Sequence, residues 1–246
     1  MNRIIIGLLA ILFSFDGLAQ HNSSNASKVH MVSFKTQFIQ IKDAFNYDLV
    51  FSGPNLVAAY SFSKNTNKDL IRFSPEIAFG GVFNKGAGFA WRFKPIDLYY
   101  GRKLSSKPFT IGAYLATDYQ WQQYSELQGG RLFWFSTIEV GPKIEYVLPY
   151  QSGLLNFSFS NSLAGFSSRP EPSTESYYYD FSFSEFISVA NQNLSFGSFN
   201  RAQFEMTLEP NSWKRLSIAY SFEYFTYTQE TRLSFISHSL NFNWKI

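Results

Sequence analysis

The sequence predicts an all-β protein, an antiparallel up-and-down transmembrane β-barrel of about ten strands. Three observations lead to this fold class. Alternation of large apolar and small or polar residues recurs from Val29 onwards, with turn-forming residues between the segments. Aromatic residues make up 20% of the chain. Beyond residue 20, no apolar run approaches the roughly 20 residues that a membrane-spanning helix needs.

The segment "RLSIAYSFEYF" illustrates the two faces of such a strand. One face carries Leu216, Ile218, Tyr220, Phe222 and Tyr224, and the other carries Ser217, Ala219, Ser221 and Glu223. A soluble β-sandwich is the alternative, but it would have to bury the bulky face of nearly every strand between sheets only about 10 Å apart. Lipid accepts such a face without limit, and aromatic clusters near strand ends suit interfacial girdles. The clusters are Tyr99 with Tyr100, Tyr119 with Trp121, residues 133–135, and Phe225 with Tyr227.

Ten segments carry the strand pattern. We expect strands at residues 29–41, 48–62, 70–83, 88–104, 109–124, 132–148, 154–166, 201–209, 215–228 and 233–246. A single-chain barrel of this kind has an even number of strands and short periplasmic turns. The expected periplasmic turns are "SKNTNKD", "SSKP", "YQSG" and "EPNSW", which are rich in turn-forming residues.

The alternation weakens over residues 167–200, which we interpret as a long extracellular loop. Ser184 supplies an N-cap signal for a short helix within it. The alternative is a hairpin that extends the barrel to twelve strands. We expect this loop to be an interaction surface. Its tyrosines combine apolar contact area with a polar hydroxyl, and its phenylalanines add apolar area. These candidate contact residues are Tyr177, Tyr178, Tyr179, Phe181, Phe183 and Phe186. The competing interpretation is a cap that only seals the lumen.

Residues 1–19 have the layout of a signal peptide, which leaves residues 20–246 as a single barrel domain. Arg3 precedes an apolar run over residues 4–15, and small residues at Gly17 and Ala19 precede the expected cleavage point. The run has 12 residues, too few for a retained anchor. The chain has no Cys, so no disulfide scaffold is expected. A net charge of +3 with mixed signs gives no reason to expect a nucleic-acid partner.

Several strands place charged residues on the face opposite the apolar one, which is the lumen face of a barrel. About eight strands already enclose a lumen that side chains just fill, so we expect a packed ionic network there, with a narrow solute path as the alternative. Lys35 also lies on the lumen face. The predicted lumen charge network comprises Arg72, Glu76, Arg92, Asp97, Asp118, Glu139, Lys143, Glu145, Glu205 and Glu223.

No catalytic, cofactor-binding or metal-binding residues are predicted. The stretch "ISHSL" places His238 and its serine neighbours on opposite faces, unlike the His-x-Ser spacing of outer-membrane lipid A deacylases. No cluster has metal-ligand spacing, and "FGGVFNKGAGF" lacks the form of a phosphate loop. The sequence therefore favours a non-enzymatic role and leaves a lipid-modifying enzyme as an alternative.

The last segment, "SLNFNWKI", alternates perfectly, with Leu240, Phe242, Trp244 and Ile246 on one face. With the signal-like start and the alternating strands, it resembles bacterial outer-membrane β-barrel proteins over nearly the whole mature chain. This resemblance implies an outer-membrane location and contact with outer-membrane lipid. It also implies that these four residues form an assembly signal for the barrel-assembly machinery, although Ile246 replaces the commoner aromatic.

Fold does not set function. We expect a structural or interaction barrel, or an accessory subunit of an outer-membrane assembly, with another outer-membrane protein as its partner. A narrow-pore solute transporter is the second expectation, and the lipid-modifying enzyme is the third.

Overall fold

The computed structural model describes residues 26–44, 48–84, 86–104, 108–124, 132–169, 191–194, 198–228 and 232–246. The expected signal peptide, the expected helix after Ser184 and the six candidate contact residues of the long loop lie outside these ranges. Within them, no helix is long and apolar enough to cross a membrane.

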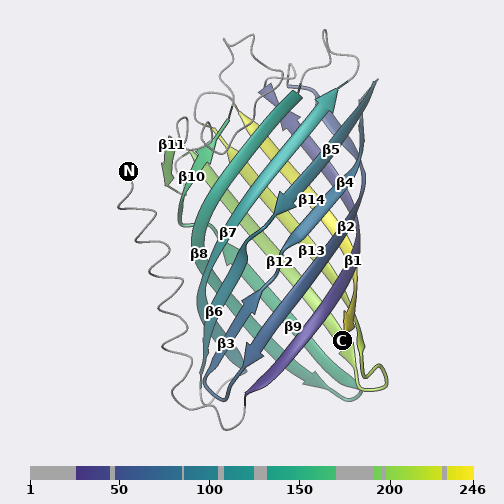
Figure 1. The fold of residues 1–246 in the computed structure, drawn as a ribbon, viewed down its shortest axis with the longest axis vertical. Coiled ribbons are helices and arrows are strands. Elements are labelled where there is room, and N and C mark those ends of the chain that lie inside the picture. Colours follow the sequence, from purple (N-terminus) through teal and green to yellow (C-terminus); the bar gives the residue numbers. More distant parts are fainter. Residues whose placement is uncertain are drawn as a thin grey trace.

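The described part of the chain forms one closed antiparallel barrel (Figure 1). The first strands are β1 (Ser27–Asp43), β2 (Val50–Asn65), β3 (Asp69–Phe73), β4 (Glu76–Phe83), β5 (Ala87–Lys94), β6 (Asp97–Lys103) and β7 (Phe109–Tyr124). The remaining strands are β8 (Leu132–Tyr150), β9 (Gly153–Asn161), β10 (Ala164–Ser168), β11 (Asn191–Leu194), β12 (Phe199–Pro210), β13 (Leu216–Tyr227) and β14 (Leu233–Lys245).

Three pairs of these strands share one position each in the barrel wall, and the four-residue β11 pairs only with β10, so the closed wall has ten positions. Strands β3 and β4 both pair with β2, β5 and β6 both pair with β7, and β9 and β10 both pair with β8. Pro75 and Pro95 lie at the first two interruptions, where proline cannot donate to the ladder. The third interruption lies at Ser162 and Leu163.

The ten predicted strands therefore correspond to the ten wall positions, and the predicted fold class is confirmed. The twelve-strand alternative is not found in the described residues. Strand β11 adds only four residues, which pair with β10.

Closure of the barrel comes from a long ladder between β1 and β14, which runs from Met31 paired with Lys245 to Asp43 paired with Leu233. A sandwich has no such closing pair. On the outer surface, the large side chains are exposed, as in Phe34 (64%), Phe242 (45%) and Trp244 (50%). Lipid is the environment that covers a continuous surface of this kind.

Part of the predicted aromatic girdle is wrong. Tyr99, Phe133, Phe135, Phe225 and Tyr227 are buried inside the barrel. The physical reason is the period of two, since residues 133 and 135 have the same parity as inward Glu139, and residues 225 and 227 have that of inward Glu223. The predicted girdle residues Tyr100, Tyr119 and Trp121 do lie on the outer surface. There the ring of Trp121 stacks on that of Trp91, with centroids 4.0 Å apart.

Four short connections lie together at one end of the barrel, here called the short-turn end. Because the strands are antiparallel, this end also holds the start of β1 and the end of β14. The connections are residues 66–68, 104–108, 151–152 and 211–215. The opposite end, here called the long-loop end (Figure 1, top), holds the short connection of residues 84–86 and also the longest interval between consecutive strands, residues 169–190.

Deleting residues 242–246 should abolish assembly of the barrel. The deletion removes the part of β14 that pairs with β1 from Met31 to Phe34, and it opens an unpaired edge in lipid. Loss of heat-modifiable migration after extraction from membranes is the expected result. Trp244→Phe, which keeps the full length, should migrate like wild type. A deletion variant that still inserted and shifted on heating would contradict this role of the closing ladder.

Candidate functional site

The interior of the barrel is the only place where the described residues bring many buried polar and charged side chains together. From the long-loop end to the short-turn end, it has three layers: an apolar layer, a layer of ion pairs and an open cavity. Each layer is built by inward-facing residues of several strands.

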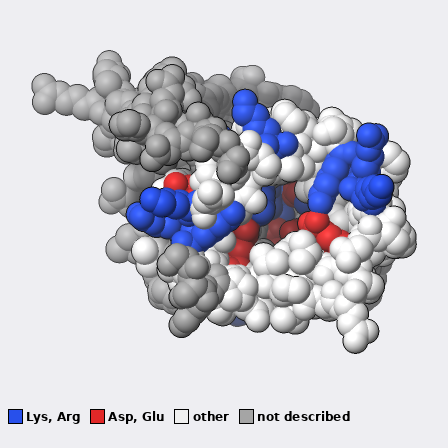
Figure 2. All heavy atoms as spheres, turned by 90° about the horizontal axis from the view of Figure 1, so that it is seen from below, with Lys and Arg blue, Asp and Glu red and all other residues white. Residues whose placement is uncertain are grey.

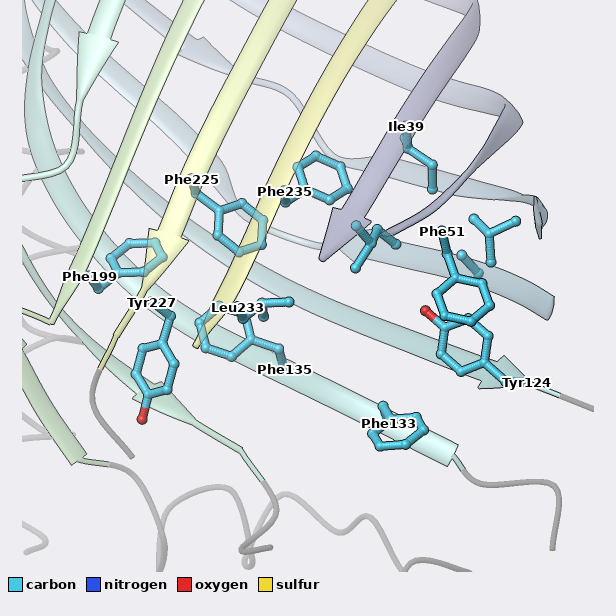
Figure 3. Packing of buried hydrophobic residues seen from close by; sticks show 13 residues of the cluster. Ile39, Phe51, Tyr124, Phe133, Phe135, Phe199, Phe225, Tyr227, Leu233 and Phe235 are labelled. Carbon is cyan, nitrogen blue, oxygen red and sulfur yellow. The ribbon is translucent and has the colours of Figure 1, made fainter. Parts of the chain in front are cut away.

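The first layer fills the long-loop half of the lumen and is here called the aromatic plug (Figure 3). The plug consists of Ile39, Ile41, Phe51, Val82, Ala90, Tyr124, Phe133, Phe135, Phe199, Phe225, Tyr227, Leu233 and Phe235. Phe225 stacks on Phe135 and Phe235, with ring centroids 5.6 and 5.0 Å apart. Offset stacking of this kind packs large rings from facing strands closely. The plug was not predicted, because the sequence analysis expected the lumen face to be small and polar.

The second layer is here called the central charge cluster and consists of Arg92, Asp118, Glu139, Arg201 and Glu223. Arg92 donates from Nε and Nη2 to Asp118 at 2.8 and 2.6 Å. The same guanidinium donates to Glu223 from Nη1 and Nη2, at 2.7 and 2.5 Å. These two bidentate carboxylate contacts occupy four of the five N–H groups of the planar guanidinium. Arg92 therefore joins β5 to β7 and, across the lumen, to β13.

Arg201 of β12 links the other acidic residues of the cluster. Its Nη2 donates to Asp118 at 2.5 Å, its Nη1 donates to Glu139 at 3.1 Å, and its Nε lies 3.2 Å from Glu223. Both arginines also contact the aromatic plug, because Arg201 lies 4.9 Å from the Phe225 ring centroid and Arg92 lies 5.1 Å from that of Phe235. The plug and the cluster are thus a continuous packed body.

A chain of alternating charges runs from the cluster toward the short-turn end. Lys94 Nζ lies 3.4 Å from Glu223 and 3.7 Å from Glu76, and Lys35 Nζ lies 2.5 Å from Glu76. Together with the cluster, the chain contains four basic residues, Lys35, Arg92, Lys94 and Arg201, and four acidic residues, Glu76, Asp118, Glu139 and Glu223. Because the opposite charges are equal in number and lie close together, their attraction offsets part of the desolvation penalty of burying them in a narrow lumen.

The third layer is a cavity of about 100 Å³ on the short-turn side of the cluster, here called the vestibule. Figure 2 looks into it from below and shows acidic side chains recessed inside a rim of basic ones. Serines make room for it, since Ser158, Ser160, Ser221, Ser237 and Ser239 line its wall. A second, separate cavity of about 10 Å³ lies on the plug side, with Arg92 in its lining.

The remaining predicted lumen residues also lie inside the barrel. Arg72 donates to Glu145 at 2.6 Å, and Lys143 lies 3.8 Å from the same carboxylate. Asp97 and Glu205 line the vestibule. Partners are often on strands across the lumen rather than on neighbouring strands, as in the Arg72 to Glu145 pair between β3 and β8.

Arg201 and Lys94 were missed by the sequence analysis. Both could have been found from parity, because Arg201 shares the face of Glu205, and Lys94 shares that of Arg92. Arg201 was overlooked because it opens its predicted strand, and Lys94 because it precedes Pro95, where the parity changes.

His238 and its serine neighbours do not form a nucleophile–base pair. Ser237 and Ser239 are buried on the lumen side, whereas His238 is exposed on the outer surface. There, Nδ1 of His238 lies 2.7 Å from the Tyr220 hydroxyl oxygen. Among the described residues, no group of three or more His, Cys, Asp or Glu is arranged to hold a metal ion.

No known family model matches the sequence, and no curated protein matches it. Among solved structures, the translocator domain of the autotransporter NalP from Neisseria meningitidis is 8% identical, with 99% of this chain and 96% of that chain covered and a TM-score of 0.43. The β domain of the Bordetella autotransporter BrkA is 9% identical, with 89% and 100% covered and a TM-score of 0.47. Neisserial surface protein A is 10% identical, with 91% and 100% covered and a TM-score of 0.36.

Arg92→Met should destabilise the barrel strongly, because it leaves Asp118 and Glu223 buried with less compensating charge. A loss of about 3–5 kcal/mol is expected for one broken buried partner. Arg72→Met is the matched control. Its ion pair with Glu145 is partly open to water, with 31% of the Arg72 side chain exposed, so a loss nearer ~1 kcal/mol is expected. Urea unfolding of vesicle-inserted protein, followed by tryptophan fluorescence, measures both. Equal losses of unfolding free energy in the two variants would show that the central charge cluster stabilises the barrel no more than the Arg72 to Glu145 pair does.

Proposed function

We propose that this protein is an integral β-barrel of the bacterial outer membrane with a closed lumen, and that it serves as a structural or interaction component rather than as a channel. It would act as an accessory subunit of an outer-membrane assembly, with its outer surface and long-loop end available for contacts.

The observation that carries this proposal is the continuous body formed by the aromatic plug and the central charge cluster. An ion that crossed the lumen would have to separate Arg92 from Asp118 and Glu223, and then pass between packed rings of the plug. Both steps are costly, because buried ion pairs and close-packed rings lose their partners when they part.

The short-turn end is proposed to face the periplasm, because barrels of this membrane have short periplasmic turns and longer outer connections. On this proposal, the vestibule opens to the periplasm and the aromatic plug lies on the cell-surface side.

A narrow-pore solute transporter is the second candidate, and the vestibule is the observation that favours it. Its lining is mostly polar and includes Glu223 of the central charge cluster. Transport would then require the cluster and the plug to rearrange.

Conductance across planar bilayers distinguishes the two candidates. Wild type should insert without steady ion conductance. The triple variant Arg92→Ala, Phe135→Ala, Phe225→Ala removes three side chains from the plug and the cluster, and it should conduct if it inserts. The control variant Phe34→Ala, Phe242→Ala removes rings only from the lipid-facing surface, and it should stay closed. Steady conductance by wild type would establish the pore and end the proposal of a closed barrel.

The tyrosines of the long loop are proposed to bind a partner at the cell surface. The variant Tyr177→Ser, Tyr178→Ser, Tyr179→Ser should assemble normally and retain less of any protein that co-purifies from native membranes. The matched variant with Phe at all three positions keeps the ring area and should retain more than the Ser variant. Equal retention by wild type and the Ser variant would count against a contact at these tyrosines.

A further inference from the structure

The short-turn end of the barrel is strongly basic. Its described residues include eight basic side chains, Lys28, Lys64, Lys68, Arg102, Lys103, Lys214, Arg215 and Lys245, but only two acidic ones, Asp69 and Glu209. Figure 2 shows this end directly, with basic side chains to the left of, above and to the right of the opening and uncharged residues along its lower edge. The vestibule and the central charge cluster do not use most of these groups.

Lys245 and Lys103 are engaged at the inner side of the rim. Lys245 Nζ lies 2.5 Å from Glu209, and Lys103 donates to the Thr66 carbonyl oxygen at 2.7 Å. Asp69 accepts a hydrogen bond from the Tyr100 hydroxyl at 3.0 Å. Both acidic residues of this end therefore already have partners.

The other six form what is here called the basic rim, namely Lys28, Lys64, Lys68, Arg102, Lys214 and Arg215. Lys28, Lys68, Arg102, Lys214 and Arg215 are exposed, and no ion pair to any of these five is found among the described residues. Such a ring of like charges repels itself unless counter-charges approach it.

Strand parity places part of the basic rim at the level of lipid headgroups. On the outward face of β2, Lys64 lies beyond Tyr60 and Phe62. On the outward face of β6, Arg102 directly follows Tyr100. The same order appears in the turn after β12, where exposed Trp213 precedes Lys214. Tyrosine and tryptophan mark the membrane interface, so a basic residue that lies beyond them toward the strand end reaches the phosphate layer.

We propose that the basic rim binds the phosphate groups of anionic phospholipids in the leaflet at the short-turn end, and so anchors the barrel at a defined depth. An acidic protein would not need the outward-facing positions of Lys64 and Arg102, which lie beside the apolar belt of the barrel. The inference rests on the proposed membrane location, and on the proposed orientation the lipids are those of the periplasmic leaflet.

The experiment compares two double variants of the full chain in phosphatidylcholine bilayers that contain spin-labelled phosphatidylglycerol or spin-labelled phosphatidylcholine. The rim variant is Arg102→Gln with Arg215→Gln. The control, Lys42→Gln with Arg232→Gln, removes the same charge at the long-loop end. Wild type and control should associate with phosphatidylglycerol about fivefold more strongly than with phosphatidylcholine, the factor equivalent to ~1 kcal/mol for a basic side chain near the headgroups. The preference should fall by at least half in the rim variant, and it should weaken with added salt.

Equal association of wild type with the two lipids would overturn the proposal, as would a preference that the rim variant keeps in full. A preference lost equally in both variants would reflect net charge and would also overturn it. Heat-modifiable migration of wild type in phosphatidylcholine alone tests membrane insertion separately from lipid preference. A protein that does not insert contradicts the membrane location, whereas a protein that inserts without lipid preference contradicts the basic rim alone.

Discussion

The hydrogen bonds between β1 and β14 are the interaction on which the rest of the structure depends. In lipid, an unpaired strand edge has no water to satisfy its backbone groups, so a sheet is stable only when its two edges meet. The ladder between these strands supplies that closure over thirteen residue pairs. Once the ring is closed at ten wall positions, its diameter is set, and so is the small space that inward side chains must fill.

This limited space explains the layered interior. Charged side chains in a narrow lumen need opposite charges at hydrogen-bond distance, and Arg92 and Arg201 each meet two or more carboxylates there. The guanidinium faces left over lie against the rings of Phe235 and Phe225. A planar cation can join an acidic layer to an aromatic layer in this way, because its edge donates hydrogen bonds while its face contacts rings.

Strand positions and most side-chain directions could be predicted because they are local properties of the chain. In β8, the alternation alone places Glu139 inward and Val140 outward, and the structure buries the first and exposes the second. Phe133 and Phe135 were expected at the lipid interface because they are aromatic, although their parity with Glu139 places them in the lumen. Aromatic residues suit a lipid interface, but they suit a sealed lumen equally well, and only their position relative to Glu139 decides between the two.

The sequence by itself determined the number of wall strands, the end that holds the short turns and the face on which nearly every side chain lies. A period of two and a set of turn residues are sufficient for that, since each strand reports its own orientation. Only the tertiary structure decided which charges meet and where the lumen closes. Arg92 and Glu223 are 131 residues apart in the chain and come together across the barrel. Their pairing depends on strand tilt and on the diameter of the closed ring, and no local pattern in either strand encodes those quantities.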